Sequence, residues 1–134
     1  MILVDGGPLV AIADADDQHH SSCKTALASL REPLGTVWPV LAEAMYLLTD
    51  LPDGQNALWE MIARGAVALL PLDFVDVPRI RELMGKYSDR GMDLADAALI
   101  RVAERERLIR FFTVDRKDFE VYRLYGRIRP ALIP

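Results

Sequence analysis

The sequence has one cysteine, two histidines and no long apolar run, and each scarcity narrows the class of protein. Cys23 alone cannot form an internal disulfide, which agrees with a reducing compartment. His19 and His20 are adjacent, so they do not share a helix face, and no histidine or cysteine stands at zinc-ligand spacing. No apolar segment approaches the length of a membrane span, and no leader peptide is recognisable. We therefore expect a cytoplasmic protein that is not associated with a membrane.

The chain also lacks an overall excess of positive charge, since its formal net charge is −4. The charge is unevenly distributed along the sequence. Residues 1–64 hold three basic and nine acidic residues, whereas residues 65–134 hold thirteen basic and eleven acidic ones. Solvated helix faces explain most of the later basic residues. A basic rim around a local group of acids would nevertheless suit a ligand with a phosphate backbone.

Apolar strand-like segments alternate with helical patterns throughout the 134 residues, which predicts a single domain over residues 1–134. The last strand should lie at an edge of the sheet, because Pro130 cannot donate to a central ladder. Continuously apolar strands separated by helices predict an α/β fold with a parallel sheet covered on both faces. The predicted strands are 2–5, 35–38, 66–72, 109–114 and 127–132. The predicted helices are 9–13, 17–31, 39–49, 55–64, 77–87, 93–107 and 116–122, with a tight turn at Gly6–Pro8.

Four acidic residues stand where carboxylates are costly to bury. Asp5 directly follows three apolar residues, and Asp115 ends the apolar run 109–114. Glu43 lies on the apolar side of one predicted helix, and Asp96 lies in the first turn of another. In a parallel sheet, ligands collect at the carboxyl ends of the strands, where Asp5 and Asp115 are expected. Converging carboxylates repel one another unless a cation binds them, so we predict a shared divalent metal site.

Ordinary structural roles are also open to these acids. Asp5 could form a turn, and Glu43 could pack its stem while its head reaches water. Asp96 could interact favourably with the N-terminus of its helix. Its neighbour Asp93 is interpreted as the N-cap of that helix and as a structural residue.

Asp115 and Asp118 compete for the fourth place in the predicted site. Asp115 is favoured because its position after a strand matches that of Asp5. Asp118 is interpreted as a capping residue or as a partner of Arg116 or Lys117. Ligands that are all oxygens favour Mg²⁺ or Mn²⁺ over zinc.

With these residues in view, the sequence resembles a PIN domain, and specifically the VapC-type ribonuclease toxins of toxin–antitoxin pairs. The resemblance covers nearly the whole chain and rests on four segments, Ile2–Asp5, Leu41–Ala44, Lys86–Ala97 and Thr113–Phe119. It implies a five-stranded parallel sheet, a Mg²⁺-dependent endoribonuclease, a homodimer and an antitoxin that blocks the site. It assigns the catalytic and metal-binding roles to Asp5, Glu43, Asp96 and Asp115.

One departure from the family pattern concerns Gly6, where many relatives have threonine or serine. If that hydroxyl orients water or metal, activity here is weaker, and the alternative is a PIN-like module that binds RNA or protein without cutting. A receiver-like phosphoacceptor domain would need paired acids after the first strand and a lysine at the end of a late strand. The chain shows neither feature clearly.

Overall fold

Five short strands form one parallel sheet in the order β3-β2-β1-β4-β5 in the computed structural model, which describes residues 1–134. The strands are β1 (Ile2–Val4), β2 (Leu34–Thr36), β3 (Val67–Leu69), β4 (Arg110–Phe112) and β5 (Ala131–Ile133). All four pairings are parallel. The predicted five-stranded α/β architecture is therefore confirmed, with the last strand at an edge.

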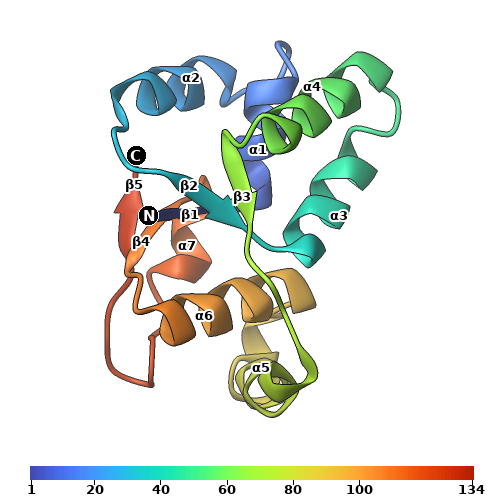
Figure 1. Cartoon of the computed structure of the whole chain (residues 1–134). Coiled ribbons are helices and arrows are strands. Elements are labelled where there is room, and N and C mark those ends of the chain that lie inside the picture. Colours follow the sequence, from blue (N-terminus) through green and yellow to red (C-terminus); the bar gives the residue numbers. More distant parts are fainter.

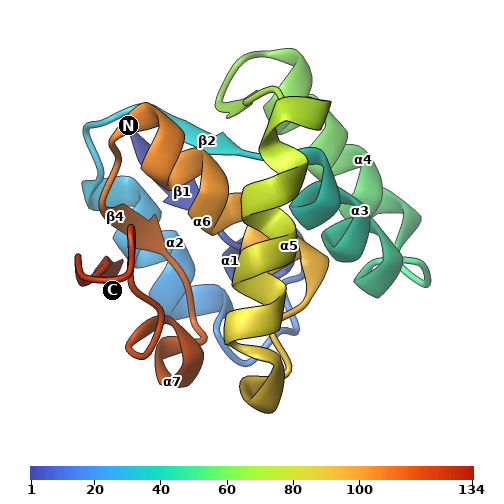
Figure 2. The same cartoon turned by 90° about the horizontal axis from the view of Figure 1, so that it is seen from below.

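Helices cover both sides of this sheet, with α1, α2 and α4 on one side and α5 and α6 on the other (Figure 1). Helix α5 lies outside α6 and packs against it (Figure 2). Helix α3 packs against both α1 and α6. No helix is long and apolar enough to cross a bilayer. The helices are α1 (Gly6–Ala13), α2 (His20–Ser29), α3 (Trp38–Leu47), α4 (Pro52–Ala63), α5 (Val77–Lys86), α6 (Leu94–Glu106) and α7 (Arg116–Phe119), with single 3-10 turns η1 (Phe74–Asp76) and η2 (Ser88–Arg90).

Helix α6 is held firmly in the core. Ala97 and Ala98 have no exposed surface, and neither have Leu99 and Ile100. Two small residues in succession let the helix approach its neighbours closely. The first turn of α6, which carries Asp96, is consequently fixed relative to the sheet.

The predicted turn at Gly6–Pro8 is wrong, because α1 begins at Gly6 immediately after Asp5. Pro8 fits the first turn of a helix, since its missing N–H group would have no intrahelical partner there. The change matters for the site, because Asp5 becomes the residue that joins β1 to the N-terminus of a helix.

Other differences are shifts of element ends. Helix α4 begins at Pro52, inside a segment that was expected to be a loop. Strand β5 begins at Ala131, four residues later than predicted, because the preceding chain folds into a small turn closed by a bridge between Leu124 and Ile128.

Candidate metal and active site

Asp5 is fixed where β1 and β4 end side by side. Val4 and Phe112 are register partners, so the residues that follow them are neighbours. The hydroxyl of Thr113 donates to Oδ2 of Asp5 over 2.9 Å, and Thr113 has no exposed surface. Asp5 is only 8% exposed. The sequence left the direction of the Thr113 hydroxyl open, and the structure directs it to Asp5.

Asp96 is oriented by residues on both sides of it. Its amide donates to the N-cap Asp93 over 2.9 Å, as predicted for the start of α6. Its Oδ2 accepts a hydrogen bond of 2.7 Å from the hydroxyl of Tyr122. Tyr122 is fully buried and packs edge-on against Tyr87 and Phe119. Sequence reasoning missed Tyr122, because a tyrosine among apolar residues carries no signal that its hydroxyl reaches a distant acid.

Asp115 does not occupy the position that was predicted for it. Strand β4 ends at Phe112, so Asp115 lies three residues beyond the strand and caps α7, accepting from the amide of Asp118 over 3.3 Å. Its own amide donates to Thr113 Oγ1 over 3.0 Å, which ties this turn to the residue that holds Asp5. Asp118 pairs with Arg90 over 3.1 Å, so the expectation of a pair with an adjacent basic residue is wrong.

Glu43 is exposed on α3, although its neighbour Ala44 is buried. Val40, one turn earlier on α3, is buried, but Leu47 is 59% exposed, so the predicted apolar face is only half correct. A Cβ atom on Gly6 would lie 3.5 Å from Oε1 of Glu43. The carboxyl group of Glu43 is therefore turned back toward Asp5 and the start of α1.

The electrostatics indicate that these acids share one region. Burial, reinforced by Asp115 and Asp93, raises the pKa of Asp5. Burial and the charges of Asp5, Asp93 and Asp115 raise the pKa of Asp96 to about 7. Burial and the neighbouring Asp93 and Asp5 raise the pKa of Glu43 to about 7, and burial also raises that of Asp115. Asp93, which was assigned to capping alone, thus also contributes charge to this region.

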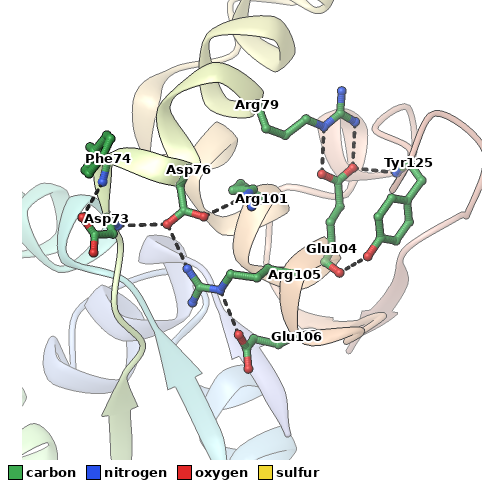
Figure 3. Close-up of polar contacts among 9 residues, drawn as sticks. All are labelled: Asp73, Phe74, Asp76, Arg79, Arg101, Glu104, Arg105, Glu106 and Tyr125. Carbon is green, nitrogen blue, oxygen red and sulfur yellow. Dashed lines mark hydrogen bonds and ion pairs between the residues drawn. The ribbon is translucent and has the colours of Figure 1, made fainter.

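Two other buried acids behave in the opposite way. Arg101 and Arg105 bind Asp76 over 2.8 and 2.9 Å, and Arg79 binds Glu104 over 2.7 Å (Figure 3). Although burial opposes ionisation, these partners hold the pKa values of both carboxyl groups below their ordinary range. The chain therefore pairs its structural acids with arginine.

No basic side chain of the protein pairs with Asp5, Glu43 or Asp96. Thr113 holds Asp5 and Tyr122 holds Asp96 through separate hydrogen bonds. No three acidic, histidine or cysteine side chains are placed to hold one ion directly in this arrangement. The predicted acids are thus gathered at one end of the sheet but do not form a closed cage. Their oxygen-only chemistry and unbalanced negative charge fit a hard divalent cation.

These pKa shifts predict how the stability of the metal-free protein depends on pH. The folded-state pKa values of Asp96 and Glu43 lie above their unfolded values, so the folded chain binds more protons at mildly acidic pH. Stability should fall as the pH rises from about 5 to about 8. Thermal unfolding in a chelating buffer measures this change, and a melting temperature that rises over the same interval would contradict it.

Comparison with known proteins identifies the family to which this chain belongs. The model of the PIN domain family matches residues 2–124. Ribonuclease VapC26 of Mycobacterium tuberculosis is 28% identical over an alignment 135 residues long, and the alignment includes 99% of this chain and 100% of that protein. The crystal structure of VapC20 of Mycobacterium tuberculosis, described as a toxin that cleaves the sarcin–ricin loop, superposes with a TM-score of 0.75 at 19% identity over 83% of this chain and 87% of that one. A toxin–antitoxin complex from Klebsiella pneumoniae superposes with a TM-score of 0.69 at 20% identity over 99% and 100%. The chain belongs to the PIN domain family and is a distant homologue of the VapC ribonuclease toxins.

Proposed function

We propose that this protein is a metal-dependent endoribonuclease and the toxin of a toxin–antitoxin pair. One observation carries the proposal: the buried Asp5, the half-buried Asp96 and Asp115 and the exposed Glu43 of a PIN domain gather at the carboxyl end of the sheet, and none of them forms an ion pair with a basic side chain. Elsewhere in the same chain, buried acids are neutralised by arginine. A divalent cation is the partner that this set of oxygens best suits.

Asp5 and Asp96 are proposed as the principal ligands of Mg²⁺ or Mn²⁺, with Glu43 and Asp115 bound directly or through water. When bound, the metal would supply an activated water molecule and neutralise charge on the scissile phosphate. The roles of Thr113 and Tyr122, which hold Asp5 and Asp96, are the same for one ion or two and for either metal.

The side chains around these acids would keep them ready for the cation. Thr113 donates to Asp5 and accepts from the amide of Asp115, so one buried hydroxyl connects two of the proposed ligands. Tyr122 holds Asp96 from the core side. Ligands whose orientation is fixed by such outer hydrogen bonds lose little freedom on binding.

Basic residues beside the site would hold flanking phosphates of the RNA. Arg90 lies next to Asp118, and Lys117 is exposed. Arg116, which directly follows Asp115 in the sequence, forms an ion pair with Glu120 over 3.4 Å and donates to the carbonyl oxygen of Pro134. Lys117, which forms no ion pair, is therefore more available than Arg116 to bind a phosphate in the turn that follows β4.

A toxin of this family would also have protein partners. We propose a cognate antitoxin that covers the carboxylates, and a homodimer in the cytoplasm. Trp38 and Trp59 lie with ring centroids 6.5 Å apart and are 56% and 47% exposed, which gives α3 and α4 an apolar surface suited to contact with another chain.

The test is cleavage of RNA by the purified protein with Mg²⁺ and with chelator. Cleavage should require the metal, and Asp96→Asn should reduce it by at least about a hundredfold, the scale of losing one preorganised charged group. Asp50→Asn, which removes an exposed carboxylate elsewhere, should cleave as the wild type does. Equal cleavage by Asp96→Asn and Asp50→Asn would refute the proposal.

Gly6 supports a second candidate, a PIN module that binds RNA but cuts it poorly. A Cβ at Gly6 would meet only Oε1 of Glu43 at 3.5 Å and the carbonyl oxygen of Val40 at 4.0 Å, both ordinary contacts. Space therefore does not forbid a hydroxyl here. RNA binding that is equal with Mg²⁺ and with chelator, without cleavage, would identify the module.

A further inference from the structure

A cavity of about 570 Å³ lies at the opposite end of the sheet from the carboxylates. Leu108 and Ile109, which line it, precede β4, whereas the carboxylate site lies beyond the end of that strand. The remaining apolar residues that line the cavity come from the end of α6 and from the chain before β5, namely Ala103, Leu124, Tyr125 and Ile128. The volume is within the usual range for sites that bind small organic molecules.

The wall of the cavity is held in place by the buried acid Glu104. The amide of Tyr125 donates to Oε2 of Glu104 over 2.6 Å, and the Tyr125 hydroxyl donates to the carbonyl oxygen of Glu104 (Figure 3). Tyr125 adopts the left-handed conformation with φ of 53°, followed by Gly126 at 74°. Arg79 fixes Glu104 from the other side. These contacts within the chain fix the position of Tyr125 in the cavity wall.

The charge at the cavity is positive and uncompensated. Arg107 and Arg127 complete the lining; both are exposed, so they form its rim, and neither forms an ion pair within the chain. The acids near Arg107 in sequence form ion pairs with other residues, Glu104 with Arg79 and Glu106 with Arg105. Two guanidinium groups at an apolar cavity, in a protein of net charge −4, select for a negative ligand.

We propose that this cavity binds a small amphipathic organic anion, with an aliphatic or aromatic body and one carboxylate. The apolar lining would take the body, and Arg107 and Arg127 would bind the carboxylate. A neutral apolar ligand would leave both arginines unused. A highly charged anion would find no other polar side chains except the Tyr125 hydroxyl, which is already bonded to Glu104.

The experiment is a titration followed by two-dimensional amide NMR, with phenylbutyrate as the probe and phenylbutylamine as its cationic counterpart. Phenylbutyrate should cause saturable shifts confined to residues 103–109 and 124–128. Phenylbutylamine should bind at least about tenfold more weakly, the loss expected for one charge-assisted contact. No saturable shift at millimolar phenylbutyrate, or equal binding of the two probes, would overturn the proposal.

Two double variants distinguish binding by the cavity arginines from a general effect of the protein's charge. Arg107→Asn with Arg127→Gln should weaken phenylbutyrate binding by at least about tenfold, and asparagine suits the left-handed conformation of residue 107, whose φ is 58°. Arg31→Gln with Arg64→Gln makes the same charge change at two exposed positions outside the cavity and should leave binding unchanged. Equal affinities for the two double variants would also overturn the proposal. Neither outcome depends on RNA cleavage, so the proposed nuclease function can fail or succeed separately.

Discussion

Asp5→Asn should make the metal-free protein more stable at neutral pH while removing its response to Mg²⁺ and at least about 99% of its RNA cleavage. The carboxylate of Asp5 is buried, has no basic partner and has a raised pKa, so its ionisation opposes folding. Asparagine keeps an oxygen that can accept from Thr113 and removes the charge. The gain should be about 1–2 kcal/mol in the free energy of unfolding, measured by denaturant titration in chelator.

The pH dependence gives this prediction a sign that can be checked. Because the folded-state pKa of Asp5 is raised, its destabilising effect is fully present above that pKa and disappears below the ordinary value of 3.8. The advantage of Asp5→Asn should therefore vanish in acid. Mg²⁺ should raise the melting temperature of the wild type and leave that of the variant unchanged, since only a ligand of the folded state stabilises it. Asp50→Asn is the control, and a variant less stable than the wild type in neutral chelator would contradict the argument.

Local patterns predicted the parts of this site that depend on neighbours in sequence. An acid directly after a buried apolar strand predicted Asp5, and an acid one turn into a capped helix predicted Asp96. The rule that ligands collect at the carboxyl ends of parallel strands then predicted that Asp5 and Asp115 lie at the same end of one sheet. Pro130 also predicted the last strand, β5, as an edge strand, although its predicted start was four residues too early.

The remaining parts depend on choices between distant residues that a local pattern does not distinguish. Many arginines lie in the second half of the sequence, and nothing local selects Arg90 as the partner of Asp118. The hydroxyl of Tyr122 reaches Asp96 across 26 residues of sequence. Gly6 and Pro8 resemble a turn locally, but packing of α1 against α3 favours a helix there. No local pattern marks Asp76 and Glu104 as buried acids, because an acid near an arginine in sequence normally lies on a solvated face.

The acids that lack a basic partner and the acids that pair with arginine lie in different parts of the molecule and have different roles. The acids that lack a basic partner lie at the carboxyl end of the sheet, and their raised pKa values mean that their ionisation opposes folding in the absence of metal. The paired acids lie between α5 and α6 and join those helices (Figure 3). Since α6 also carries Asp96, the paired acids help to fix the helix that supplies a proposed ligand. The same residue type thus has opposite effects on stability, and the difference is set by whether arginine is within reach.

Asp76→Asn should therefore destabilise the protein, by about 3–5 kcal/mol at neutral pH, in contrast to Asp5→Asn. Asp76 has no exposed surface and accepts from Arg101 and Arg105, whose side chains are only 24% and 23% exposed. Removing the carboxylate would leave two largely buried guanidinium groups without their partner. Equilibrium unfolding in denaturant at neutral pH measures the loss.

Glu82→Gln is the matched control for this change, because Glu82 lies on α5, the helix that Asp76 directly precedes, pairs with Arg79 and is 69% exposed. An exposed pair contributes little, so this control should lose less than about 1 kcal/mol. The lowered pKa of Asp76 means that its stabilising effect is present above the ordinary value of 3.8 and is lost as the pH falls through the lower folded value. The difference between Asp76→Asn and the wild type should accordingly shrink in strong acid. A loss no larger than that of Glu82→Gln at neutral pH would show that the paired acids do not hold α5 to α6.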